Sequence, residues 1–135
     1  LARAKSFYDN PSKKRLQQIM GWFVCDKEAM QPIIDSLTDS RFENAMREEV
    51  RRSNNSIFAT AAVPIPTVAL KRIENPILLV HGRDDKVCSI ESSYYLLEHL
   101  NNAQLHVFSQ CGHWTQNEKK DEFNFLIQQF FRKRV

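Results

Sequence analysis

Glycine is scarce in this sequence. Only Gly21, Gly82 and Gly112 occur among the 135 residues, and no two of them lie four positions apart. The spacing therefore excludes a G-x-S-x-G turn, which holds a serine nucleophile between a strand and a helix. A serine nucleophile of that type would have to come from outside these residues.

Cysteine pairs and long apolar runs are also missing. Cys25, Cys88 and Cys111 are far apart and form no C-x-x-C pair, which favours free thiols in a reducing cytoplasm. We expect no metal, because neither H-x-x-x-H nor a similar ligand spacing occurs. No apolar run approaches the ~20 residues of a membrane span. The net charge of +3 is spread over mixed signs, so neither a membrane nor a nucleic acid is expected as partner.

What is present is a globular composition in two regions of different character. Hydrophobic residues make up 42% and charged residues 26%, as in folded domains. Residues 6 to 62 carry helical spacing, with one helix after Asn10-Pro11, a short one around Met30–Leu37 and a third over Phe42–Val50 that Ser53–Ser56 stops. A linker follows, and its three prolines discourage regular structure: Pro64, Pro66 and Pro76.

The region from Asn75 onward alternates between strand and helix. The run Ile77–Val80 predicts a strand buried on both faces, and Leu105–Phe108 predicts a second strand. Each is followed by an amphipathic helix. The residues on its inward stripe are Ser93, Leu96, Leu97 and Leu100 in one and Phe123, Leu126, Ile127 and Phe130 in the other. This order predicts an α/β class with parallel strands. Two strands make a small sheet, so we expect further sheet outside the sequence.

Candidate catalytic side chains follow both predicted strands. HGRDD follows the first and CGHW the second, and the carboxyl ends of parallel strands share one edge of a sheet. Asp84, Asp85 and His113 are therefore expected close together, where an acid could orient an imidazole base. Either aspartate could equally form a turn or cap a helix. His81 could line the cleft edge, whereas His99 and His106 suit surface or packing positions.

These motifs resemble the C-terminal part of the α/β-hydrolase fold. Its catalytic acid follows a strand in a G-x-x-D turn, here Gly82 to Asp85, and its histidine follows the last strand, here His113. The stretches HGRDDKV and NAQLHVFSQCGHWTQNEKKDEFNFLIQQFF are similar to the meta-cleavage product hydrolases. QQIMGWFVCD and LTDSRFENA resemble the helical lid of those enzymes. The resemblance implies a lid over residues 1–66 and the last core strands with flanking helices over 67–135.

The resemblance also implies roles for single residues. Asp85 would orient His113, the proton shuttle, and Asp84 would be the turn residue beside it. Trp114 would pack against the bound dienoate. Arg41 would hold the substrate carboxylate through its forked guanidinium, or be an exposed arginine at a helix start. Phe23 would line the apolar half of the pocket, or be core.

Meta-cleavage product hydrolases split a carbon–carbon bond in 2-hydroxy-6-oxo-hexa-2,4-dienoates from aromatic catabolism, with a Ser-His-Asp triad and no metal or organic cofactor. We therefore expect a cytoplasmic C-terminal fragment whose serine, oxyanion hole and remaining core lie in a missing N-terminal half. Alone it should be inactive and should aggregate or pair with that half, and a homo-oligomer is a further expectation. Cys88 and Cys111 are expected to be packing residues. The alternatives are an esterase or lactonase of the same fold, or a non-catalytic binding module.

Overall fold

The computed structural model describes residues 6–59, 63 and 65–132, which form two compact units. The helical unit contains the described residues up to Trp22 and those from Lys27 to Val63, and the strand unit contains Phe23–Asp26 and the described residues from Ile65 onward. The predicted division into a lid up to residue 66 and a core from residue 67 stays a prediction. Two expectations, Pro64 as a linker proline and helix over 60–62, lie outside the described residues.

The helical unit consists of a 3-10 turn, η1 (Ser6–Asp9), and three helices, α2 (Lys13–Phe23), α3 (Lys27–Met46) and α4 (Glu48–Ala59). Its buried apolar side chains are Phe7, Met20, Met30 and Ile34. The predicted start of the first helix at Asn10-Pro11 is wrong by two residues. Ser12 precedes the helix, and its hydroxyl oxygen accepts the N–H of Arg15 at 3.2 Å, the bond that favours serine at a helix start.

The second and third helices also differ from the prediction. The two short helices expected around Met30–Leu37 and Phe42–Val50 are wrong, because α3 runs through Pro32 to Met46. Its buried residues Met30, Ile34 and Thr38 follow each other at four-residue spacing, so one continuous stripe faces the interior. The break comes at Arg47, between α3 and α4.

The predicted stop at Ser53–Ser56 is wrong as well, because α4 continues to Ala59. Asn54 shows how a polar residue is accommodated there: its amide donates to the Val50 carbonyl one turn earlier and to the Tyr8 hydroxyl, both at 3.0 Å. A backbone carbonyl has two lone pairs, so Val50 can accept this bond beside a helical one.

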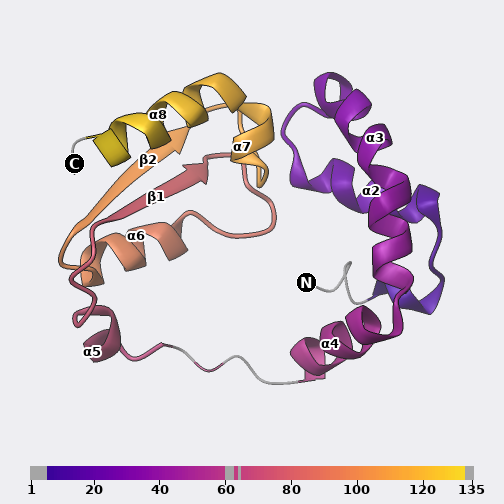
Figure 1. Cartoon of the computed structure of the whole chain (residues 1–135), viewed down its shortest axis with the longest axis horizontal. Coiled ribbons are helices and arrows are strands. Elements are labelled where there is room, and N and C mark those ends of the chain that lie inside the picture. The colour runs from indigo at the N-terminus through magenta and orange to yellow at the C-terminus, as the bar shows by residue number, and fades with distance from the viewer. Residues whose placement is uncertain (1–5, 60–62, 64, 133–135) are drawn as a thin grey trace. The chain divides into compact units, whose positions relative to one another are not determined.

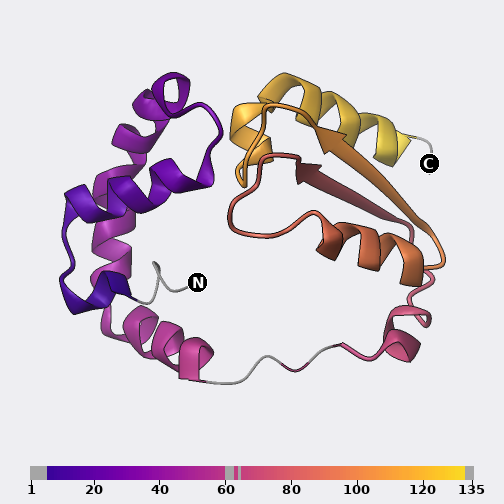
Figure 2. The same cartoon turned by 180° about the vertical axis from the view of Figure 1, so that it is seen from behind.

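The strand unit has two parallel strands with helices beside them. Its elements are α5 (Thr67–Leu70), β1 (Ile77–Gly82), α6 (Glu91–His99), β2 (Ala103–Phe108), α7 (Thr115–Glu118) and α8 (Lys120–Arg132). β1 pairs with β2 from Ile77 opposite Ala103 to Gly82 opposite Phe108, which confirms the parallel order. α6 and α8 lie on opposite sides of the strands in both views (Figures 1 and 2). The proline linker is less irregular than expected, since α5 begins directly after Pro66.

The faces of this sheet are only partly covered. Ile77–Val80 are of intermediate burial, so the expectation of a strand buried on both faces is wrong for this chain. All residues of α8 are described, and none of them is buried. Phe125 and Phe131 on this helix are 64% and 63% exposed. Within the described residues, no helix combines the length and the apolar character that crossing a membrane requires.

Candidate active site

The loops after β1 and β2 meet at the carboxyl edge of the sheet. The Asp84 N–H donates to the Cys111 carbonyl at 2.9 Å, and the Cys111 N–H donates back to Asp84 Oδ2 at 3.3 Å. The Arg83 N–H donates to the Phe108 carbonyl at 2.8 Å. Asp84 is therefore a turn residue that ties the two loops together, as the sequence predicts for it.

Two glycines allow the loops to pass this closely. A Cβ atom on Gly82 would overlap the carbonyl oxygens of Gly112 and Cys111, and one on Gly112 would lie 2.5 Å from the Phe23 carbonyl oxygen. Gln110 adopts a positive φ of 50°, the left-handed conformation that turns a chain tightly. Two of the three glycines thus stand where backbone touches backbone.

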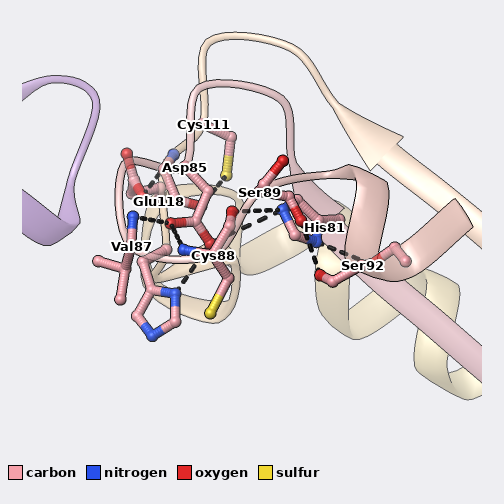
Figure 3. A network of polar contacts seen from close by, with 11 residues as sticks. His81, Asp85, Val87, Cys88, Ser89, Ser92, Cys111 and Glu118 are labelled. Atoms are coloured by element: carbon pink, nitrogen blue, oxygen red, sulfur yellow. Dashed lines mark hydrogen bonds and ion pairs between the residues drawn. The ribbon is translucent and has the colours of Figure 1, made fainter. Parts of the chain in front are cut away.

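Asp85 and His113 form a hydrogen-bonded pair on this edge. Nδ1 of His113 lies 2.8 Å from Asp85 Oδ2, as the strand-end argument predicts. The other oxygen, Oδ1, accepts the backbone N–H groups of Val87 at 2.7 Å and Cys88 at 3.0 Å, and the side chain of Asp85 is only 6% exposed. Figure 3 shows Asp85 with Val87 and Cys88 in this polar network. The carboxylate is therefore held in one orientation.

These contacts also set the charge of Asp85. Burial opposes its ionisation, but the hydrogen bonds from His113 and from the amides of Cys88 and Val87 outweigh it and lower the pKa of Asp85. An ionised carboxylate only accepts hydrogen bonds, so the proton between the two groups belongs to Nδ1. The neutral ring then keeps its lone pair on Nε2. A histidine in this state can take a proton from a nucleophile placed beside Nε2.

The aromatic ring of Phe23 lies against both the histidine ring and Trp114. The ring of Phe23 is centred 5.5 Å from that of His113 and 5.7 Å from that of Trp114. The His113 N–H donates to the Phe23 carbonyl at 2.6 Å. Trp114 is 6% exposed, and Phe23 is of intermediate burial. The structure thus brings both predicted pocket residues to the pair, and their contact with a substrate stays a prediction.

Glu118 is a residue that the sequence did not single out. Its Oε1 accepts the N–H of Gly112 at 2.9 Å, and its Oε2 accepts the N–H of Cys25 at 2.6 Å. One carboxylate therefore fixes the loop before His113 to the segment after Phe23. A glutamate one turn after the loop was the only signal in the sequence, and it did not reveal which amides it would bind.

His81 is a buried neighbour of Asp85, with Nε2 3.8 Å from Asp85 Oδ2. It is 7% exposed, and its expected place at the cleft edge stays a prediction. Nε2 lies 3.2 Å from the Cys88 carbonyl oxygen, and Nδ1 lies 2.8 Å from the Ser93 hydroxyl. A carbonyl only accepts, so Nε2 carries the proton and Nδ1 accepts from Ser93. His81 thereby joins the loop that carries Asp85 to the first turn of α6.

The remaining candidates lie elsewhere or behave differently. Cys111 is fully buried, and burial, followed by the nearby Glu118 carboxylate, raises its pKa to about 12, which confirms a packing role. Cys88 is exposed, so the packing role expected for it is wrong.

Arg41 lies on α3 in the helical unit, and its role stays a prediction. His106 is exposed on β2, and His99 lies on α6, where Nδ1 is 2.8 Å from the Tyr95 carbonyl oxygen.

One group of side chains matches a metal-ligand set. Single ligand atoms of Asp85, Cys88 and His113 all lie within 4.8 Å of one another. Ligand spacings along the sequence do not reveal this combination, because it joins two loops that meet only in the folded chain.

Known proteins resemble this chain over most of its length. A family model described as the alpha/beta hydrolase fold matches residues 4–120. A 2-hydroxy-6-oxononadienedioate/2-hydroxy-6-oxononatrienedioate hydrolase from Pseudomonas sp. is 33% identical over 128 residues, which is 93% of this chain and 44% of that protein. A 2-hydroxy-6-oxo-6-phenylhexa-2,4-dienoate hydrolase from Comamonas testosteroni is 34% identical over 131 residues, 94% of this chain and 44% of that protein.

A solved structure shows the same likeness in three dimensions. The 2-hydroxy-6-oxo-6-phenylhexa-2,4-dienoate hydrolase from Rhodococcus sp. strain RHA1 superposes with a TM-score of 0.84 at 34% identity, covering 98% of this chain and 48% of that one. The chain thus spans less than half the length of the relatives it matches.

Proposed function

This chain belongs to the alpha/beta hydrolase fold family, and from that premise we propose that it supplies the acid and the base of a carbon–carbon bond hydrolase. The substrates would be 2-hydroxy-6-oxo-hexa-2,4-dienoate-type products of aromatic ring cleavage. The observation that carries the proposal is the 2.8 Å contact between Asp85 Oδ2 and His113 Nδ1 at the carboxyl edge of two parallel strands. The names of the relatives from Pseudomonas, Comamonas and Rhodococcus support the substrate class.

In this proposal each residue has a defined task. Asp85 keeps the proton of His113 on Nδ1 and stabilises the imidazolium that forms. His113 moves a proton through Nε2, first while the dienol substrate becomes its keto form and then when a serine attacks the ketone carbonyl. Cleavage of the carbon–carbon bond releases 2-hydroxypenta-2,4-dienoate and leaves an acyl group on the serine, and water then hydrolyses this ester to release the carboxylic acid. Trp114 and Phe23 would contact the diene, and Arg41 would hold the carboxylate through two parallel hydrogen bonds.

The serine and the oxyanion hole would come from sequence outside these residues. The 135 residues contain no G-x-S-x-G turn, and the relatives are more than twice as long as the matched part. The exposed side chains of Phe125 and Phe131 support an N-terminal half of the core as the partner that covers them. No metal or organic cofactor takes part in the proposed chemistry. A cytoplasmic location and a homo-oligomer are further parts of the proposal.

The test begins with the coding sequence upstream of residue 1, which should encode a strand followed by G-x-S-x-G. The protein containing both parts is then given a yellow meta-cleavage product and a simple ester. Bleaching of the dienone with release of the dienoate supports the proposal. Ester turnover without bleaching would favour an esterase, and turnover of neither substrate would favour a non-catalytic module.

A further inference from the structure

The group formed by Asp85, Cys88 and His113 has the chemistry of a metal site. One ligand atom from each lies within 4.8 Å of the other two. We propose that these three side chains bind zinc and similar thiophilic divalent cations, and that Cys88 is the residue that creates the site. The binding does not depend on the proposed function.

The loop after β1 presents two of the three ligands. Asp85 Oδ1 accepts the N–H groups of both Val87 and Cys88, which folds residues 85–88 into a turn around the carboxylate. Asp85 and Cys88 accordingly lie next to each other in the polar network of Figure 3. These two bonds would hold Oδ1 while Oδ2 binds the ion, and hydrogen bonds of this kind orient metal-binding carboxylates.

The donor set selects the class of ion. A carboxylate, a thiolate and an imidazole provide three ligands of the kinds that zinc accepts, and a water would complete four-coordination. Mg²⁺ and Ca²⁺ prefer oxygen ligands and would gain little from the sulfur. Access is open from solvent, because Cys88 is exposed and the His113 side chain is 35% exposed.

The ion requires only small movements. Ligand atoms around tetrahedral zinc lie about 3.2–3.8 Å apart, given metal–ligand bonds of about 2.0–2.3 Å. No separation between ligand atoms in the group exceeds 4.8 Å, so the Cys88 sulfur has to approach by no more than roughly 1.5 Å. Asp85 Oδ2 and His113 Nδ1, now 2.8 Å apart, must separate by roughly 0.5 Å. The ion would then stand where the proton between them stands now.

This position has a consequence for the proton on the ring. The Cys88 thiol loses its proton to solvent when its sulfur binds the ion. The proton of the His113 ring moves from Nδ1 to Nε2, so the neutral ring keeps one proton. Nε2 then donates a hydrogen bond and no longer has the lone pair of a base. A bound zinc ion would therefore switch off proton transfer by His113.

The experiment compares the unaltered protein with C88S and a matched control, C25S, which removes another free cysteine of the strand unit. Each is titrated with Zn²⁺ by calorimetry and with Co²⁺ in the spectrophotometer. Circular dichroism checks that the three proteins are equally folded. The unaltered protein and C25S should bind one Zn²⁺ and show the thiolate-to-cobalt absorption. C88S should lose that absorption and bind Zn²⁺ roughly 100-fold more weakly, because it lacks a direct ligand.

X-ray absorption of the zinc-loaded, unaltered protein gives a readout that needs no variant. The proposal requires one sulfur at about 2.3 Å from the zinc. Equal zinc affinity in C88S, a larger loss in C25S, or a zinc shell without sulfur would overturn it. So would the absence of any saturable binding to the unaltered protein.

Discussion

The carboxyl edge of the sheet and the two faces of the same sheet differ in how far their residues are buried and hydrogen-bonded. At the edge, Asp85, His81 and Cys111 have few exposed atoms, and their polar groups have partners. On the faces, β1 is half-buried and α8 has no buried residue. The edge is thus organised by contacts within this chain, whereas the faces retain apolar area available for another part of a core. Substitutions at the edge should therefore change activity and the free energy of unfolding strongly, and those at the faces should change them little.

The largest effect is expected from replacing the proposed base. In the serine-containing protein that the proposal requires, H113A should lower kcat about 10³–10⁴-fold, because no other group would move the proton. The matched control is H106A, which removes an exposed histidine of β2 and should stay within about twofold. Steady-state kinetics with a dienoate substrate measures both. Equal kcat values for H113A and H106A would mean that His113, at the edge of the sheet, has no catalytic role.

The neighbouring aspartates give the next comparison. D85N should lower kcat about 10³-fold, because the amide can donate to Nδ1 and favour the wrong ring tautomer. D84N weakens a 3.3 Å hydrogen bond from the Cys111 amide and should lower kcat less than about tenfold. The assay is the same as for H113A. A larger loss of kcat in D84N than in D85N would mean that Asp84, and not Asp85, orients His113.

Close backbone packing at the edge predicts a large loss of stability from a single methyl group. G82A would press a Cβ atom into two carbonyl oxygens, and we expect a loss of about 3 kcal/mol or more in the free energy of unfolding. In G21A the nearest atom to the new Cβ is a lysine carbon at 3.9 Å. That helical substitution should stabilise by about 0.5–1 kcal/mol. Urea unfolding of both variants tests this, and a harmless G82A would contradict the described approach of the loops.

The carboxylate of Glu118 should contribute a smaller amount to the free energy of unfolding. E118Q places an amide NH₂ group against one of the two backbone N–H donors, Gly112 or Cys25. The expected loss is about 1–2 kcal/mol in the free energy of unfolding. E122Q, at an exposed position of α8, should change it by less than about 0.5 kcal/mol. Equal losses in the two variants would show that the hydrogen bonds of Glu118 to Gly112 and Cys25 do not stabilise the fold.

The smallest effect concerns pH. The pKa of Asp85 is lowered in the folded chain, so its stabilising effect is present above the unfolded value of about 3.9 and is lost as the pH falls through the folded value. The unaltered protein should therefore lose more stability than D85N between about pH 5 and pH 2. Urea midpoints at several pH values measure this, and parallel curves would contradict it.

Patterns along the sequence predicted the parallel strands and the meeting of Asp85 with His113. This worked because strand-end position follows from element order alone, and the carboxyl ends of parallel strands share an edge. The same patterns failed between Leu37 and Phe42 and at Ser53–Ser56, where helices continue. Side-chain bonds such as that of Asn54 to Val50 decide those cases, and they are not visible as periodicity.

Contacts between distant segments that do not follow from the order of the strands could not be predicted. Glu118 is bound to Cys25, 93 positions away, and His81 turned out to be buried because Ser93 and Cys88 both bind it. The metal-ligand group was missed for the same reason, since His113 joins Asp85 and Cys88 only through the folded edge. Apolar spacing predicted the stripe of α8, but burial depends on what covers it.

In the catalytic pair, Asp85 holds the proton of His113 on Nδ1 and leaves Nε2 free to act as a base. Nitrogen NMR of histidine-labelled protein near neutral pH reports the tautomer of each ring directly. We expect His113 of the unaltered protein to be protonated on Nδ1 and this preference to disappear in D85N. A ring protonated mainly on Nε2, or the same tautomer in both proteins, would contradict it.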